Sequence, residues 1–165
     1  MKPKKPISAL KRVLIVDDDQ DIRLALRALL RDAGYQVVGE AGDGIKAMEL
    51  MAKHKPAITL LDITMPGVSG LDVLKDIKEN YVLTKVVMIS GEATSDYVTE
   101  ALRRGATGFI VKPFNFNNVM KNIERALAEA TVAVKKLKSQ QKNQSGLLQQ
   151  NEGKQDPPVD KEKSA

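Results

Sequence analysis

The stretch "VLIVDDDQDIRLALRALLRDAG", residues 13–34, combines one strand and one helix in succession. Its first four residues are all apolar, which predicts a short strand buried on both faces. Three aspartates follow, and after them apolar residues recur at the helical period up to Gly34, a residue typical of helix ends. The apolar positions on one helix face are Ile22, Leu26, Leu29 and Leu30. The stretch is therefore one strand–helix unit with a row of carboxylates after its strand.

The same unit recurs four more times along the chain. Further apolar runs are "YQVVGE" (35–40), "AITLLD" (57–62), "KVVMIS" (85–90) and "GFIVK" (108–112). An amphipathic stretch of helical period follows each run. Five alternations in about 120 residues predict a single α/β domain, with a parallel sheet, helices on both faces and right-handed crossovers. In such sheets ligands bind at the carboxyl ends of the strands.

Composition narrows the class of protein. The chain has 165 residues, of which 42% are hydrophobic, enough for a packed core. It has no Cys, which excludes disulfides and thiolate metal sites. No apolar run is long enough to span a bilayer, and the first residues, "MKPKKPISALKR", lack the apolar stretch of a signal peptide. These features predict a soluble cytoplasmic protein.

The net charge of +5 comes from the two ends of the chain. Residues 1–12 contain five basic and no acidic residues, and residues 135–165 contain seven Lys against four acids. The segment between them is left with 14 basic and 17 acidic residues, so it is slightly acidic. A nucleic-acid-binding face would concentrate basic charge on the domain, so this distribution argues against a nucleic-acid partner.

From about residue 138 the composition changes to Gln, Asn, Lys and Pro, which predicts a disordered polar tail. Before it, apolar residues with 4-3-4-3 spacing leave open that the last helix extends past the sheet and pairs with another chain. These are Ile123, Leu127, Ala130, Val134 and Leu137. The seam is short, and Thr131 and Val132 are mediocre helix formers. We therefore favour a helix whose inner half packs on the sheet and whose outer half frays.

Four of the five predicted strands deliver functional groups to the same edge of the sheet. Only the second, which ends in Glu40-Ala41-Gly42, adds no obvious one. The groups at the other four ends are Asp17-Asp18-Asp19, Asp62, Ser90-Gly91-Glu92 and Lys112-Pro113. Any one of them alone is typical of a turn or a helix N-cap, but their convergence indicates a site.

The chemistry of this set is that of phosphoryl transfer. Clustered carboxylates repel one another unless a cation lies among them, and oxygen ligands without His or Cys suit Mg²⁺. An isolated Asp62 beside that cation can attack a phosphoryl group and form an acyl phosphate. Lys112 and the Ser90 hydroxyl can then bind phosphoryl oxygens and spread the charge of the transition state.

Four segments together resemble the signature regions of response-regulator receiver domains, in the order typical of that family. They are "VDDD", "LLDITMPGVSGLDVL", "MISGEA" and "GATGFIVKPF", and the resemblance covers residues 12 to about 130. It implies a flavodoxin-like (βα)5 three-layer sandwich with strand order 2-1-3-4-5. It further implies a stand-alone, chemotaxis-regulator-like protein that a histidine kinase or histidine phosphotransfer protein phosphorylates.

By this resemblance Asp62 is the phosphoacceptor and Lys112 the phosphate-binding lysine. Asp17 and Asp18 form the acidic pair. Asp18 and Asp62 would bind Mg²⁺ directly, Asp17 partly through water, and the Thr64 backbone carbonyl would complete the protein ligands. Asp19 has no required role in the family, so we interpret it as a loop residue or a helix N-cap.

The resemblance also implies a switch. Ser90 is the switch hydroxyl and Phe109 the switch aromatic, here without the hydroxyl of the Tyr that often occupies the position. Thr64 and Glu92 occupy positions that tune the lifetime of the phosphate. The family commonly has a cis peptide at Lys112-Pro113.

We expect a basic extension at residues 1–10, a receiver domain at 11–132, and a C-terminal helical extension with a polar tail at 133–165. Phosphorylation would change the surface formed by the fourth helix, the fifth strand and the fifth helix, and so its affinity for a downstream protein. We expect a monomer or a weak phosphorylation-dependent dimer through this surface. The only chemistry catalysed would be phosphorylation and dephosphorylation of the chain's own aspartate.

Three other functions are alternatives to this one. A Mg²⁺-dependent phosphohydrolase of the haloacid-dehalogenase type uses the same groups, but its nucleophile opens an Asp-x-Asp after the first strand, whereas Asp62 follows the third. A receiver fold kept only as a protein-binding scaffold would not need the complete set of site residues. Nucleic-acid binding through the Lys-rich ends would be weak and salt-sensitive, because no recognition helix is expected after residue 138.

Overall fold

The computed structural model describes residues 8–152, with side chains described through residue 144. Its strands are β1 (Arg12–Val16), β2 (Gln36–Ala41), β3 (Ile58–Asp62), β4 (Lys85–Ser90) and β5 (Gly108–Val111). Its helices are the short 3₁₀ segment η1 (Ala9–Lys11), α1 (Gln20–Asp32), α2 (Gly44–His54), α3 (Gly70–Asn80), α4 (Ser95–Arg103) and α5 (Phe116–Glu152). The strands form one parallel sheet of order β2-β1-β3-β4-β5. This confirms the predicted fold class and strand order.

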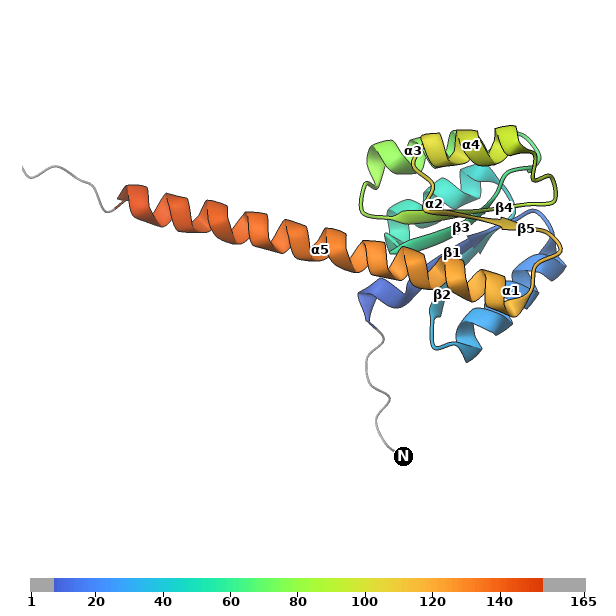
Figure 1. The fold of residues 1–165 in the computed structure, drawn as a ribbon, viewed down its shortest axis with the longest axis horizontal. Helices are drawn as coiled ribbons and strands as arrows, with labels where there is room; N and C mark the ends of the chain where they lie inside the picture. Colours follow the sequence, from blue (N-terminus) through green and yellow to red (C-terminus); the bar gives the residue numbers. More distant parts are fainter. Residues whose placement is uncertain (1–7, 153–165) are drawn as a thin grey trace, which may run out of the picture. The chain divides into compact units, whose positions relative to one another are not determined.

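Two apolar layers hold the sheet, one on each face (Figure 1). Helices α2, α3 and α4 cover one face, and α1 and the first turns of α5 cover the other. Successive β1 residues alternate between the layers: Val13 and Ile15 pack toward α1 and α5, and Leu14 and Val16 toward α2 and α3. Strands β1, β3 and β4 are buried on both faces, which is why they are almost continuously apolar instead of alternating with polar residues.

The predicted start and stop of α1 are both confirmed. The Asp19 side chain accepts hydrogen bonds from the Asp21 and Ile22 amides, at 2.8 and 3.3 Å, and so caps the helix. Gly34 has φ +83°, the left-handed conformation that only glycine adopts at low cost. Asp19 is therefore an N-cap residue.

A close backbone approach fixes the end of β3. The Gly70 amide donates to the Ile63 carbonyl at 2.8 Å, which folds the β3–α3 loop back onto the strand. A Cβ at position 70 would collide with the backbone carbonyl of Asp62, so only glycine fits there. The start of α3 thus lies directly against the residue that ends β3.

The chain divides into two compact units, one ending at Val132 and the other starting at Ala133. Helix α5 continues through both to Glu152, whereas the composition predicted fraying and disorder from about residue 138. Gln is the commonest residue of this segment and a good helix former, and no Pro interrupts the segment before residue 157. Predictions for residues 1–7 and 153–165 fall outside the described residues.

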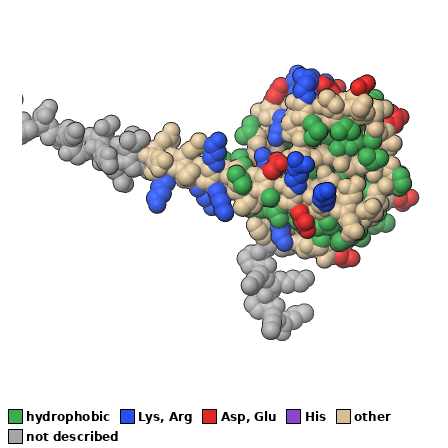
Figure 2. All heavy atoms as spheres, in the orientation of Figure 1, with side chains coloured by type: hydrophobic (Ala, Val, Ile, Leu, Met, Phe, Trp, Pro, Cys, Tyr) green, Lys and Arg blue, Asp and Glu red, His purple; other side chains and the backbone are tan. Residues whose placement is uncertain are grey.

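Charge is distributed differently in the two units. On the face of the first unit shown in Figure 2, basic and acidic side chains are interspersed. In the second unit, the described side chains include the exposed Lys135, Lys136, Lys138 and Lys142 and no acid. Among the described residues, no helix combines the length and the apolarity needed to cross a bilayer.

Candidate functional site

Three carboxylates converge at the carboxyl edge of the sheet. Asp17 directly follows β1, Asp18 comes next, and Asp62 is the last residue of the neighbouring β3. One carboxylate oxygen from each of the three lies within 4.8 Å of the others. Asp17 and Asp62 are buried, with 0% and 3% of their surface exposed, whereas Asp18 is exposed. Two of these three charges are thus removed from water, so they need positive charge nearby.

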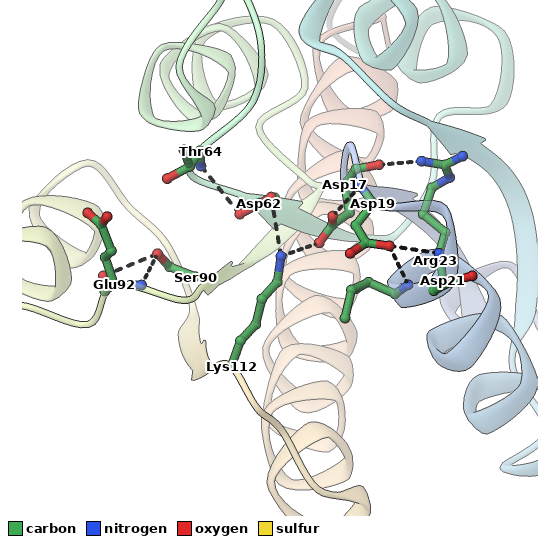
Figure 3. Close-up of polar contacts among 10 residues, drawn as sticks. Asp17, Asp19, Asp21, Arg23, Asp62, Thr64, Ser90, Glu92 and Lys112 are labelled. Carbon is green, nitrogen blue, oxygen red and sulfur yellow. Dashed lines mark hydrogen bonds and ion pairs between the residues drawn. The ribbon is translucent and has the colours of Figure 1, made fainter.

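Lys112 supplies that charge from the end of β5. Its Nζ lies 2.7 Å from Asp17 Oδ2 and 3.3 Å from Asp62 Oδ2, and Figure 3 shows the ammonium group pointing between the two carboxylates. The Lys112 amide donates to the Ser90 carbonyl, which extends the β4–β5 pairing and fixes where the side chain starts. The Lys112–Pro113 peptide is cis, as predicted.

Burial acts on the pKa values of both Asp62 and Lys112, in opposite directions. For Asp62 the effect of burial prevails, and for Lys112 the charged neighbours prevail. It raises the pKa of Asp62 from 3.8 to about 6, and the neighbouring Asp17 adds to the rise, while Lys112 and the Thr64 amide lower it in part. Burial alone would lower the pKa of Lys112, but its contacts with Asp17 and Asp62 outweigh burial and raise it. The raised pKa of Lys112 keeps its ammonium group charged beside the buried side chains of Asp17 and Asp62.

The carboxylate cluster fits a hard divalent cation. Asp17 Oδ2 is buried and receives no hydrogen bond in suitable geometry within the described residues, although the Lys112 ammonium lies beside it. All the candidate ligands are carboxylate oxygens, and no His or Cys belongs to the cluster. Mg²⁺ prefers such oxygens and usually takes one or two carboxylates. The donor set therefore fits Mg²⁺, and Asp17, Asp18 and Asp62 are the residues that would hold it.

Of the remaining predicted residues, Thr64 alone makes a hydrogen bond to these carboxylates among the described residues. The Thr64 amide donates to Asp62 Oδ1 at 3.3 Å. The Ser90 hydroxyl is buried and turned into its own loop, where it donates to the Glu92 carbonyl at 3.1 Å and accepts from the Glu92 amide at 3.0 Å (Figure 3). Phe109 is half-buried against the apolar layer under α2, α3 and α4. The Ser90 hydroxyl is thus hydrogen-bonded within its own loop and not to the carboxylate cluster.

Arg23, Arg27 and Glu40, which the sequence did not indicate as site residues, form a connected group that contacts the Asp17 backbone. Arg23 Nη1 donates to the Asp17 backbone carbonyl at 2.6 Å, and Arg23 Nε lies 3.6 Å from Glu40 Oε2. Arg27 Nη1 donates to Glu40 Oε1 at 2.9 Å. The end of β2, which offered no obvious functional group in the sequence, therefore contacts the loop that bears the acidic pair. The helical spacing of Arg23 and Arg27, four residues apart, is the one signal that places both on one face.

Comparison with known proteins identifies the family. The protein-family model of the response regulator receiver domain matches residues 13–124 of the sequence. The chain belongs to the response regulator receiver family. Receiver domains belong to the response regulators of two-component systems and are regulators rather than classical enzymes.

Curated relatives agree on this domain and differ beyond it. The chemotaxis protein CheY of Thermotoga maritima is 40% identical over 115 residues, which cover 70% of this chain and 96% of CheY. The transcriptional regulatory protein PdtaR of Mycobacterium tuberculosis H37Rv is 37% identical over 118 residues. That match covers 72% of this chain and 57% of PdtaR, so this receiver spans little more than half the length of that relative.

Solved structures of CheY proteins share this fold. A chain of the crystal structure of the CheX–CheY–BeF₃–Mg²⁺ complex from Borrelia burgdorferi is 33% identical, with a TM-score of 0.66. The match covers 68% of this chain and 85% of that chain. CheY4 of Vibrio cholerae is likewise 33% identical with a TM-score of 0.66, covering 70% of this chain and 97% of the other.

Proposed function

We propose that this receiver accepts a phosphoryl group on Asp62, with Mg²⁺, from a histidine kinase or histidine phosphotransfer protein. The observation that carries the proposal is the Lys112 ammonium between two buried carboxylates, beside a third carboxylate within 4.8 Å. Burying such a cluster costs folding free energy, because its like charges repel and lose their hydration. A bound cation and a phosphoryl group would give the cluster a function that accounts for this cost. The Borrelia CheY relative, in complex with BeF₃ and Mg²⁺, supports the same chemistry for this chain.

The nucleophile of the proposed step is a carboxylate oxygen of Asp62. It attacks the phosphorus of a phosphohistidine and forms a new P–O bond as the P–N bond breaks. The electron pair of the broken bond stays on the imidazole nitrogen of the partner, which takes up a proton. Asp62 must be ionised to attack, and a pKa raised to about 6 still leaves most of it ionised at neutral pH.

Neighbouring groups balance the charge that this step moves. When bound, Mg²⁺ would supply positive charge to the phosphoryl oxygens, and Asp17, Asp18, Asp62 and the Thr64 carbonyl would hold it. Lys112 already lies 3.3 Å from Asp62 Oδ2, so it can pair with a phosphoryl oxygen that replaces the free carboxylate. These residues orient and neutralise the reacting groups.

The output of the proposed reaction is a change of surface. The Ser90 hydroxyl would leave its bonds to Glu92 and donate to a phosphoryl oxygen, drawing in the β4–α4 loop. Phe109, half-buried on β5, would then occupy a deeper position and reshape the surface of α4, β5 and α5. A downstream protein would bind that altered surface, while Thr64 and Glu92 at the rim would set the lifetime of the acyl phosphate.

Acetyl phosphate tests this function without the natural partner. With Mg²⁺ it should add one phosphoryl group to the wild type, seen as a single mass increment by intact-protein mass spectrometry. Asp62→Asn should stay unmodified, whereas Asp72→Asn, an exposed aspartate on α3, should react as the wild type does. Equal labelling of Asp62→Asn would remove Asp62 from the role of acceptor.

A further inference from the structure

The loop that carries the acidic pair is held by a chain of contacts from outside the site. The Asp17 amide donates to the Ala41 carbonyl at 3.0 Å, and Asp17 Oδ1 accepts from the Asp19 amide at 2.9 Å. The Asp17 carbonyl accepts from Arg23 Nη1 at 2.6 Å, and Figure 3 shows the guanidinium approaching it from the side opposite Lys112. The Arg23 amide donates to the Asp19 carbonyl at 3.1 Å. Arg23 therefore donates hydrogen bonds to this loop from both its backbone amide and its side chain.

The position of the Asp18 side chain depends on these hydrogen bonds from Arg23 more than the positions of Asp17 and Asp19 do. Its side chain is exposed and makes no hydrogen bond or ion pair among the described residues, so its position follows from the backbone alone. The carbonyl that Arg23 holds belongs to the peptide joining Asp17 to Asp18. Fixing that peptide plane fixes the direction in which the Asp18 side chain leaves the backbone.

Two further residues hold Arg23 in place. Glu40, at the end of β2, lies 3.6 Å from Arg23 Nε, and Arg27 donates to the other Glu40 oxygen at 2.9 Å. The Arg23 side chain is 18% exposed and that of Glu40 25%, whereas that of Arg27 is 52% exposed. The less exposed part of the chain of contacts is thus the Arg23–Glu40 pair. The Arg23 guanidinium contacts the carbonyl through Nη1 and the carboxylate through Nε, two nitrogens held in a fixed planar geometry, whereas a lysine has a single nitrogen.

We propose that Arg23, oriented by Glu40, is a positioning residue that sets the Mg²⁺ affinity of this receiver by fixing the Asp17–Asp18 peptide. This inference rests on the proposed function, since it concerns the same cation site. Partners outside the ligand set commonly change metal affinity by tenfold or more, because they determine how well the ligands are oriented.

Charge and geometry predict opposite effects at this residue. If Arg23 acted only as a nearby positive charge, its removal would lessen repulsion of the cation and tighten Mg²⁺ binding. If it orients the loop, its removal weakens binding in spite of the lost repulsion. Arg23→Lys keeps the charge and loses the planar group, so any weakening it causes comes from geometry.

The test measures Mg²⁺ affinity by isothermal titration calorimetry for the wild type, Arg23→Lys and Arg23→Met. Arg31→Lys and Arg31→Met are matched controls on the same helix, since the Arg31 side chain is exposed and, among the described residues, its one ion pair is with the neighbouring Asp32. We expect Arg23→Met to raise the Mg²⁺ Kd by about tenfold, Arg23→Lys by a smaller factor, and the controls by less than about twofold. Hydrogen exchange of the Asp19 amide without Mg²⁺ should also be faster in both Arg23 variants, because its acceptor is on the loosened loop.

Each outcome separates this inference from the proposed function. Unchanged or tighter Mg²⁺ binding in both Arg23 variants, with wild-type exchange at Asp19, would overturn the positioning role and leave the proposed function standing. A wild type that does not bind Mg²⁺ would overturn the proposed function and this inference with it. If Arg23→Met does not fold, Arg23→Lys alone decides, since it preserves the side-chain stem and the charge.

Discussion

Asp17, Asp18 and Asp19 are chemically identical neighbours in three different environments. Asp17 is buried and paired with Lys112, Asp18 is exposed and without a side-chain contact among the described residues, and Asp19 caps α1. The repulsion expected of three adjacent charges is reduced because one is neutralised and one is turned to the helix amides. Only the first two face Asp62.

This difference leads to a prediction about Mg²⁺ binding. Asp18→Asn should weaken binding by at least about tenfold, because it removes a charged ligand from the cluster. Asp19→Asn should leave binding nearly unchanged, because Asn caps a helix as well as Asp and Asp19 is outside the cluster. Calorimetric titration of the two variants measures the effect, and a loss as large in Asp19→Asn as in Asp18→Asn would contradict the assignment.

Asp62 should make the metal-free receiver less stable as pH rises. Its pKa is about 6 in the fold against an ordinary value of 3.8, so between these values the folded chain binds more protons than the unfolded chain. The free energy of unfolding then falls as pH rises through this window and stays lowered above it. The cost is that of ionising a buried carboxylate beside Asp17.

Asp62→Asn removes this cost. In EDTA at pH 7.5 we expect the variant to be more stable than the wild type by roughly 1–2 kcal/mol, less than the full pKa shift would give because solvent at the rim screens the charge. The difference should shrink as pH falls toward 4. Urea unfolding at several pH values measures it, and a variant less stable than the wild type at pH 7.5 would contradict the account.

At the scale of helices and strands, the apolar pattern predicted most of the structure. Short runs rich in apolar residues identified all five strands, and the central strands are almost continuously apolar because a parallel strand buried on both faces has no polar alternation. The pattern could not show that Arg23 and Arg27 reach Glu40, since that contact depends on how α1 lies against the end of β2. It also could not show that the Ser90 hydroxyl bonds to Glu92, because side-chain rotation leaves no trace in the sequence.

The junction of β3 and α3 is the element that most restricts the position of Asp62. Gly70→Ala would drive a Cβ into the Asp62 carbonyl, so we expect a loss of about 2 kcal/mol or more in stability and slower phosphorylation. Gly91→Ala is the matched control in another loop of the site, where a Cβ would meet nothing within 4 Å. Thermal unfolding compares them, and a Gly70→Ala variant as stable as Gly91→Ala would show that the junction can relax.

At the scale of the whole molecule, the receiver core ends before α5 does. Ala130 is the last buried residue of α5 among those with described side chains, and the compact first unit ends at Val132. The length of α5 could not be predicted from the apolar pattern, because among its described side chains none after Ala130 is buried, although the helix continues to Glu152. We propose that residues 11–132 form the complete receiver.

Truncation after Val132 tests this boundary. The shortened chain should unfold within a few degrees of the full chain and react with acetyl phosphate at a rate within roughly twofold, because its core and site are intact. Circular dichroism melting and mass spectrometry give the two values. A truncated chain that is unfolded, or folded but unreactive, would mean that the residues after Val132 are part of the receiver.

The central claim is that Asp62 carries the phosphoryl group. Borohydride reduces an aspartyl phosphate to homoserine, which marks the acceptor permanently, and peptide mass spectrometry then locates it in the sequence. After treatment with acetyl phosphate and Mg²⁺, homoserine should appear at position 62 and at none of positions 17, 18 or 19. Homoserine at one of those aspartates, or at no aspartate in a protein shown to be folded and Mg²⁺-bound, would contradict the account.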